Sequence, residues 1–182
     1  MVITRVGYAG GTTQAPTYKQ MGDHTETLQI EFNPKVISFR NLLKVFWENH
    51  NPNRALYKER QYISIILYQN EEQRVLIEKM KSELEYELKE EIQTEVSPCK
   101  HFTLAEDYHQ KYYLKKYPDA VEKMRTIYPT DDEYFSSTLV ARLNGFVKGY
   151  GTLTNIKEEI RSWNTSQVNQ TKLIDLINSI KW

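Results

Sequence analysis

Cysteine is nearly absent from this sequence. Its 182 residues include one, Cys99, so the chain cannot close an internal disulfide or build a metal site from thiolates alone. These limits exclude the disulfide framework of a small secreted domain, and we expect a reducing, cytoplasmic location. Long hydrophobic runs are missing as well. The longest, from Ile63 to Tyr68, is interrupted at Ser64 and is too short for a signal-peptide core or a membrane span.

An excess of charge of either sign is also lacking. The 24 Lys and Arg residues balance 24 Asp and Glu, which removes the basic field that gathers a protein on nucleic acid or anionic membranes. Seven glycines and six prolines are too few for a low-complexity chain, and 12% aromatic residues argue against disorder. We therefore expect a folded, soluble protein with neither a nucleic acid nor a membrane as partner.

The first part of the chain alternates between strand and helix patterns. Val2–Tyr8 is rich in β-prone residues and leads into a flexible turn over 9–13. Thr25–Asn33 alternates between apolar and polar residues, as a half-buried strand does. Ser38 can cap a following helix, in which apolar residues recur from Phe39 to His50 with helical spacing.

The alternation continues over the next 70 or so residues. Gln61–Tyr68 predicts an apolar strand in the centre of the sheet, and Glu71–Ile92 predicts a charged helix with one narrow apolar stripe. A short strand is expected over Thr94–Val96, and a helix over Leu104–Tyr117. This order predicts a two-layer α+β fold in which a mixed sheet is covered by helices.

From about residue 119 the pattern predicts helices without strands. They are expected over Ser137–Lys148, Asn155–Trp163 and Gln170–Trp182. We therefore divide the chain into a domain over residues 1–118 and a helical C-terminal extension over 119–182.

Glu26 is the most informative polar residue. It has the strand parity of Leu28, Ile30 and Phe32 and is therefore predicted to point to the apolar side of its strand. Removal from water favours the protonated carboxyl, which would suit Glu26 to donate a proton at neutral pH. The alternative places Glu26 at the mouth of the strand, either hydrated or paired with a lysine.

Two tyrosines stand near Glu26 in this scheme. Tyr18 follows the glycine turn, and Tyr62 opens the strand predicted over Gln61–Tyr68. Their hydroxyl groups can converge on Glu26, or the two rings can be ordinary core or rim residues, and parity does not decide between these arrangements.

A set of short motifs is similar, in order and content, to peptide-methionine (S)-S-oxide reductases. The similarity covers about residues 3 to 117. Its motifs are Val6-Gly7-Tyr8-Ala9-Gly10-Gly11, Pro16-Thr17-Tyr18, His24-Thr25-Glu26, Ile37-Ser38-Phe39, Leu42-Leu43-Lys44-Val45-Phe46-Trp47-Glu48-Asn49-His50, Gln61-Tyr62, Thr94-Glu95-Val96 and Ala105-Glu106-Asp107-Tyr108-His109-Gln110.

The resemblance implies a reductase of methionine sulfoxide, free or in proteins. A cysteine thiolate attacks the sulfoxide sulfur, methionine leaves, and a thiol donor such as thioredoxin reduces the resulting sulfenic acid. Glu26 matches the family's acid, and Tyr18 and Tyr62 match its two hydroxyl donors to the sulfoxide oxygen. The resemblance implies no bound cofactor.

The sequence also departs from the family. In the family, the nucleophile belongs to a Gly-Cys-Phe-Trp motif upstream of Gly7. The residues from Met1 to Gly7 contain no such motif, so we expect the family nucleophile to be absent from this sequence. Cys99, between Pro98 and Lys100, lies outside that motif and is expected to be structural. The loop over 51–60 lacks the aspartate of the family's Gln-Gly-x-Asp-x-Gly segment, and Ile63 replaces an arginine. An alternative function is therefore a pseudoenzyme that binds oxidised methionine or a partner without catalysis.

Other kinds of site find no support in the sequence. The four histidines, His24, His50, His101 and His109, lack the spacing of metal ligands, and the glycines of 7–11 form neither dinucleotide nor phosphate motif. We expect neither a metal nor a nucleotide. Glu106–His109 is expected to cap the start of a helix.

Overall fold

The computed structural model describes residues 3–53 and 59–182, so part of the divergent loop over 51–60 lies outside the described residues. The chain folds into two compact units: Val6–Glu106, and Met1–Arg5 together with Asp107–Trp182. We call them the sheet unit and the helical unit. The sequence-based boundary between residues 118 and 119 stays a prediction.

Within residues 3–53 and 59–182, five strands form two small sheets. In the first, β1 (Ile3–Ala9) lies between β2 (Thr25–Glu31) and β5 (Phe102–Leu104), and β1 pairs antiparallel with β5, with Gly7 opposite Leu104. In the second, β3 (Ile65–Tyr68) runs parallel to β4 (Glu95–Pro98). Strands of both orientations are present, as expected, but they form two sheets in place of one.

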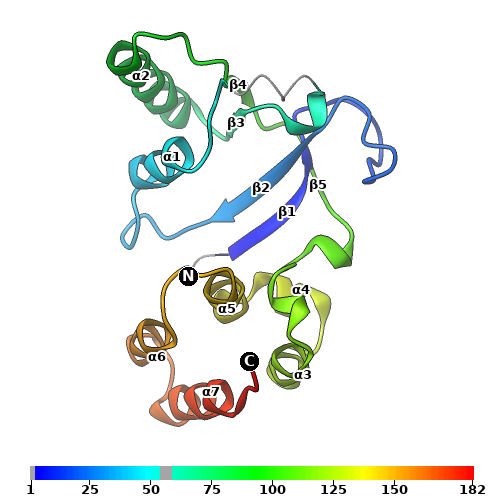
Figure 1. The fold of residues 1–182 in the computed structure, drawn as a ribbon, viewed down its shortest axis with the longest axis vertical. Helices are drawn as coiled ribbons and strands as arrows, with labels where there is room; N and C mark the ends of the chain where they lie inside the picture. Colours follow the sequence, from blue (N-terminus) through cyan, green and yellow to red (C-terminus); the bar gives the residue numbers. More distant parts are fainter. Residues whose placement is uncertain (1–2, 54–58) are drawn as a thin grey trace. The chain divides into compact units, whose positions relative to one another are not determined.

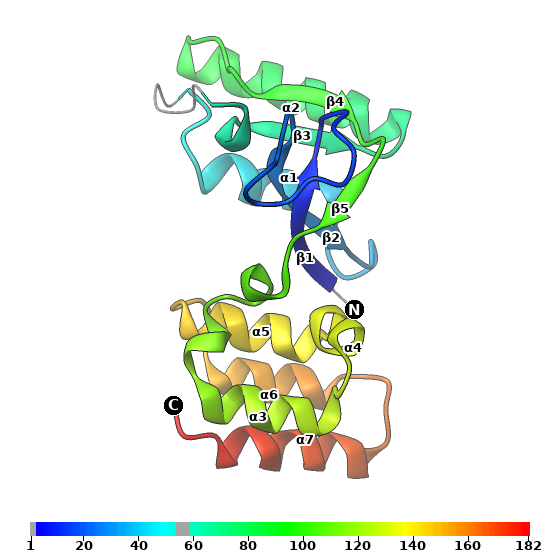
Figure 2. The ribbon, with the colours of Figure 1, turned by 90° about the vertical axis from the view of Figure 1, so that its right-hand side faces the viewer.

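Two helices complete the sheet unit, α1 (Phe39–Glu48) and α2 (Glu71–Leu88), and they lie beside β3 and β4 (Figures 1 and 2). The Ser38 hydroxyl accepts a hydrogen bond from the Asn41 amide, which confirms the predicted cap of α1. The shared core consists of Leu43, Trp47, Ile66, Ile77 and Ile92. These residues fix α1 and α2 against the second sheet.

Two sequence-based predictions of elements are wrong. The strand expected over Gln61–Tyr68 begins only at Ile65, because Arg60–Tyr62 forms the 3₁₀ turn η1; β3 also belongs to a two-stranded sheet and is not central. The helix expected over Leu104–Tyr117 is replaced by β5 and two 3₁₀ turns, η2 (Asp107–His109) and η3 (Leu114–Lys116). Lys111 between them has φ +51°, a left-handed conformation that a continuous right-handed helix cannot contain.

The helical unit contains α3 (Pro118–Ile127), α4 (Asp131–Ser136), α5 (Thr138–Val147), α6 (Leu153–Arg161) and α7 (Gln167–Ser179). Figure 2 shows them stacked in layers. Their core is fully buried at Leu143, Ile160 and Ile177. The described residues beyond 119 are therefore helical without strands, as the sequence predicts. None of the described helices is both long and apolar enough to cross a membrane.

Candidate functional site

The site begins at the turn between β1 and β2, which is held together by the carboxylate of Asp23. Asp23 accepts hydrogen bonds from the amides of Thr12 (2.8 Å) and Thr13 (2.9 Å) and from both threonine hydroxyls. The hydrogen bonds from Thr13, followed by those from Thr12, hold the pKa of Asp23 well below its usual range. A Cβ at Gly11 would lie 2.5 Å from an Asp23 carboxylate oxygen, so only glycine fits there.

The imidazole of His24 supports the same turn. His24 is buried, its Nδ1 accepts a hydrogen bond from the Gly11 amide at 3.2 Å, and its Nε2 lies 3.0 Å from the Thr13 carbonyl. Because Nδ1 accepts, the ring proton is assigned to Nε2, which donates to that carbonyl. Both nitrogens of His24 are therefore used in building the turn.

Glu26 lies next along β2 and is exposed. The prediction that its carboxyl is removed from water is wrong, and the alternative of a hydrated position at the mouth of the strand is correct. Parity shows which residues share a face of a strand, but another element must cover that face to bury it. Leu28, on the same face, is itself 55% exposed. The Glu26 carboxylate is held by Gln61, whose Nε2 donates to its Oε1 at 2.7 Å.

The structure brings Tyr18 and Tyr62 together beside Glu26. Each tyrosine is 42% exposed. Partial shielding from water raises the pKa of Tyr62 above its ordinary value, and the hydrogen bond with the Tyr18 hydroxyl and the nearby charges of Tyr18 and Glu26 raise it further. The two phenols and the carboxylate thus form one polar group at the surface of the sheet unit.

Glu106 anchors the segment that carries Tyr18. Its carboxylate accepts from the Tyr8 hydroxyl at 2.6 Å and from the Tyr18 amide at 3.0 Å. The prediction that Glu106 helps cap a helix is therefore wrong, since its carboxylate reaches back to two segments far away in sequence.

The segment that carries Tyr62 is anchored at both ends. Before it, the Arg60 carbonyl accepts from the Thr25 hydroxyl at 2.8 Å. After it, the Ser64 hydroxyl lies 2.7 Å from both His50 Nε2 and the Thr94 hydroxyl. These hydrogen bonds tie η1 to β2 on one side, and they tie the residues that follow η1 to the segment after α1 on the other.

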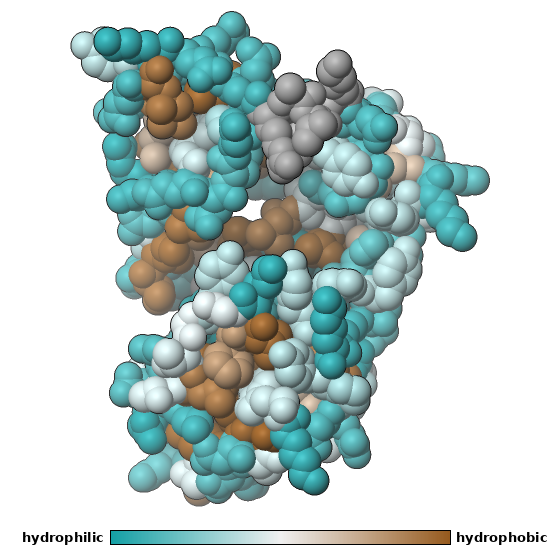
Figure 3. Space-filling model, in the orientation of Figure 1, coloured by the Kyte–Doolittle hydropathy of each residue, from teal (hydrophilic) through white to brown (hydrophobic). Residues whose placement is uncertain are grey.

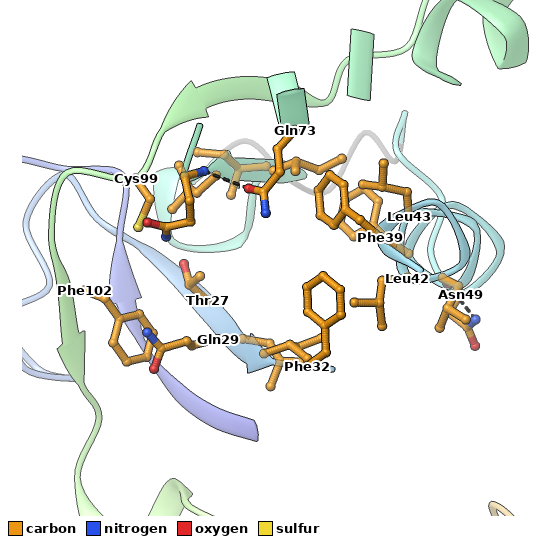
Figure 4. Close-up of a pocket in the computed structure, with 18 of the residues that line it drawn as sticks. Thr27, Gln29, Phe32, Phe39, Leu42, Leu43, Asn49, Gln73, Cys99 and Phe102 are labelled. Atoms are coloured by element: carbon orange, nitrogen blue, oxygen red, sulfur yellow. Dashed lines mark hydrogen bonds between the residues drawn. The ribbon is translucent and has the colours of Figure 1, made fainter. Parts of the chain in front are cut away.

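An apolar cavity of about 520 Å³ lies on the same unit. Figure 4 shows Thr27 and Gln29 of β2 on one side of it and Phe39 and Leu42 of α1 on the other. In the space-filling view, hydrophobic side chains gather in a recess beside the part of the molecule that carries α1 and α2 (Figure 3). Leu28, Ile30 and Phe32, the apolar face predicted for β2, also line this cavity.

Cys99 lines the same cavity as a free cysteine of intermediate exposure (Figure 4). Its amide donates to the Tyr68 carbonyl at 2.8 Å, which fixes the backbone there. The cavity therefore holds the only thiol of the 182-residue sequence.

Metal ligands do not gather in the described part of the chain: no group of three or more His, Cys, Asp or Glu side chains is arranged there to hold an ion. Two of the four histidines have structural contacts: His24 holds the β1–β2 turn, and His50 holds Ser64, two residues after η1.

Sequence reasoning missed four residues that organise the site: Asp23, Arg60, Gln61 and Glu106. Gln61 and Glu106 lie inside motifs that carry the family resemblance, which was a usable signal. Asp23 lies in a loop and Arg60 begins the short turn η1, and only the folded structure shows what their charged side chains contact.

Comparison with known proteins identifies the family. The model of the family described as peptide methionine sulfoxide reductase matches residues 1–139. The chain belongs to this family. The match extends beyond the motif-bearing residues 3–117 into the region of α3 and α4.

Individual reductases agree with this assignment. The chain is 41% identical over 157 residues to a peptide methionine sulfoxide reductase of Drosophila melanogaster, an alignment that covers 86% of the chain and 63% of the fly protein. It is 43% identical over 126 residues to one from Methanosarcina acetivorans, covering 64% of the chain and 67% of that protein. The chain thus spans less than two thirds of the length of the fly protein.

Solved structures of the family confirm the α+β fold. Mxr1 from Saccharomyces cerevisiae in reduced form superimposes with a TM-score of 0.56 and 32% identity, covering 63% of this chain and 71% of Mxr1. Methionine sulfoxide reductase A of Corynebacterium diphtheriae superimposes with a TM-score of 0.54 and 28% identity, covering 65% of this chain and 66% of that protein.

Proposed function

We propose that the sheet unit binds methionine S-sulfoxide, free or in proteins, and holds the sulfoxide oxygen while a thiol reduces the sulfur. One observation supports this above all: Tyr62 contacts Tyr18 beside Glu26 on a surface open to solvent. Two phenol hydroxyls and a carboxyl form a donor set suited to an oxygen that gains negative charge and then a proton.

The proposed reaction takes place in two stages. A cysteine thiolate attacks the sulfoxide sulfur, the sulfur–oxygen bond breaks, and the oxygen leaves with the attacking sulfur as a sulfenic acid. One proton balances this stage; Glu26, which is open to solvent, delivers it to the oxygen while Tyr18 and Tyr62 donate hydrogen bonds to the same atom. Two thiols of a thioredoxin-like donor then reduce the sulfenic acid, releasing water and forming a disulfide on the donor.

The thiolate of the first stage is not Cys99 in this proposal. Cys99 lies in the apolar cavity lined by β2, α1 and β3, whereas the polar group lies at Glu26, Tyr18 and Tyr62. The sequence contains no Gly-Cys-Phe-Trp motif. We therefore assign the attacking thiol to a cysteine or small thiol outside these 182 residues.

The test uses the 182-residue chain with methionine sulfoxide amide, N-acetylated, as separate S and R epimers. Binding is followed by NMR, and reduction by dithiothreitol is followed with and without the chain. We expect preferential binding of the S epimer, and an acceleration over dithiothreitol alone that the Cys99→Ser variant retains. The variants Tyr18→Phe and Tyr62→Phe serve as matched losses of one hydroxyl each.

Different outcomes separate the alternatives. Binding of the S epimer without any acceleration would favour a sulfoxide-binding pseudoenzyme. Acceleration that disappears in Cys99→Ser would assign the nucleophile to Cys99. If neither epimer binds and neither is reduced faster, the proposed function is wrong.

A further inference from the structure

The guanidinium of Arg60 joins three segments of the sheet unit. Its Nε donates to the Asp23 carbonyl at 3.1 Å, and its Nη2 donates to the Gly10 carbonyl at 3.0 Å. Nη1 and Nη2 also bind the two carboxylate oxygens of Glu95 on β4. The side chain therefore binds both ends of the β1–β2 turn and the second sheet at once.

Arg60 is also the first residue of η1, and the two residues that follow it belong to the polar site. Gln61 holds the Glu26 carboxylate, and Tyr62 contacts Tyr18. The backbone of Arg60 is fixed too, since its carbonyl accepts from the Thr25 hydroxyl, one residue before Glu26. A displacement of Arg60 would therefore move Gln61 and Tyr62 relative to Glu26 and Tyr18.

We propose that Arg60 is a positioning residue: by clamping η1 to the β1–β2 turn and to β4, it sets the distance between the hydroxyl of Tyr62 and the carboxylate of Glu26. The effect of Arg60 on sulfoxide recognition rests on the proposed function. The effect of Arg60 on the geometry of Tyr18 and Tyr62 is independent of that function.

The chemistry of the clamp favours arginine. A guanidinium offers five donors in a fixed plane, so it can hold a carboxylate with two nitrogens while donating to carbonyls with others, and an ammonium lacks this geometry. The hydrogen bonds with Arg60 hold the pKa of Glu95 below its ordinary value, and that with Glu95 raises the pKa of Arg60. The pair therefore remains ionised at neutral pH.

The surroundings fit this role. The Ser97 hydroxyl donates to the same Glu95 carboxylate at 2.7 Å, which fixes the acceptor. Gly10 has φ +82°, and a Cβ there would lie 3.1 Å from the Ile65 side chain and 3.5 Å from Arg60 Nη2. Glycine thus allows the turn to present its carbonyl to the guanidinium.

The experiment compares Arg60→Lys and Arg60→Ala with Arg74→Ala as the matched control. Arg74 also binds a carboxylate, that of Glu71, through Nε and Nη2, but on the exposed face of α2. Tyrosines labelled with ¹³C are titrated by NMR in the full chain, with Tyr18→Phe and Tyr62→Phe to assign the signals. Binding of the two sulfoxide epimers and thermal unfolding are measured on the same samples.

In both Arg60 variants, we expect the Tyr62 titration to shift downward toward the ordinary value, because the shielding of Tyr62 from water and its hydrogen bond with Tyr18 are both weakened. Affinity for the S epimer should fall about tenfold, the amount that roughly one well-placed hydrogen bond to a charged or polar partner provides. Arg74→Ala should change neither the Tyr62 titration nor the affinity for the S epimer. Arg60→Lys should retain more of the thermal stability than of the Tyr62 titration or the preference for the S epimer.

The proposal is overturned if a folded Arg60 variant retains both the Tyr62 titration and the epimer preference of the original chain. It is also overturned if Arg60→Lys restores all three measurements together, since the clamp would then serve stability alone. If the titration shifts as expected but the original chain binds neither epimer, the proposed function fails and the positioning role stands. If Arg60→Ala does not fold, the lysine variant decides.

Discussion

Glu26 is bound by one side chain at an exposed position, so its chemical role can be separated from its structural one. Gln61 Nε2 donates to the Glu26 carboxylate, and in Glu26→Gln an amide oxygen can accept the same hydrogen bond. We expect the free energy of unfolding to change by less than about 0.5 kcal/mol, as for most surface substitutions.

The same substitution removes the transferable proton. We expect the chain's acceleration of sulfoxide reduction by dithiothreitol to fall about 100-fold or more, the usual contribution of a positioned acid. Rates with S-sulfoxide are measured from pH 5 to pH 9 for both proteins, and Glu83→Gln on exposed α2 serves as control. An unchanged rate and pH profile in Glu26→Gln would remove Glu26 from the mechanism.

A second prediction about a single residue concerns Tyr134 in the helical unit. Its ring is fully buried, its hydroxyl has no hydrogen-bond partner among the described residues, and Arg125 lies over the ring at 4.3 Å. Tyr134→Phe keeps the ring contact and removes a buried polar atom. We expect the variant to be more stable by about 0.5–1 kcal/mol in urea unfolding at pH 7.

The pH dependence of this variant has a definite sign. Burial raises the pKa of Tyr134 to about 12, whereas a tyrosine in the unfolded chain titrates near 10. Between these values the unfolded chain has lost a proton that the folded chain retains, so stability falls as pH rises. The loss of stability between pH 10 and pH 12 should be smaller in Tyr134→Phe. An equal loss would mean that another group causes the alkaline sensitivity.

At the scale of elements, the β1–β2 turn depends on Asp23. Its carboxylate accepts from the amides of Thr12 and Thr13, and in Asp23→Ala both amides lose this acceptor. We expect hydrogen exchange at those two amides to speed up at least tenfold, while the amides of α2 exchange as before. The lowered pKa of Asp23 means that its contribution is present above the ordinary carboxyl range and is lost as the pH falls through the folded-state value.

The elements also show what sequence patterns can and cannot predict. Local patterns predict a strand over Thr25–Asn33, the Ser38 cap and a helix over Glu71–Ile92. All three are present, although the strand ends at Glu31 and the helix at Leu88. The patterns fail where a tertiary contact overrides the local preference. Arg60–Tyr62 is held as a turn by the clamp on Gly10 and Glu95, although an apolar strand was predicted from Gln61.

The candidate site likewise contains residues that sequence motifs predict and residues that only tertiary contacts reveal. Motif order predicts Glu26, Tyr18 and Tyr62 as site residues, and the structure places these three residues together. Exposure of Glu26 could not be predicted, because it depends on whether another element covers that face of β2. Arg60 and Asp23 could not be assigned either, since several of their partners are backbone carbonyls and amides, which carry no sequence signature.

At the scale of the whole molecule, the sheet unit and the helical unit have separate cores, which implies that substitutions in either core act locally. Ile77 belongs to the core of the sheet unit and Leu143 to that of the helical unit, and both are fully buried. Truncation of a buried leucine or isoleucine to alanine costs about 2–5 kcal/mol, because apolar contacts are lost and a cavity remains. We expect Leu143→Ala to raise exchange at amides of residues 118–179 more than in α1 and α2, and Ile77→Ala to do the reverse. Native-state hydrogen exchange measures both, and equal acceleration throughout the chain in both variants would show that the two units unfold as one.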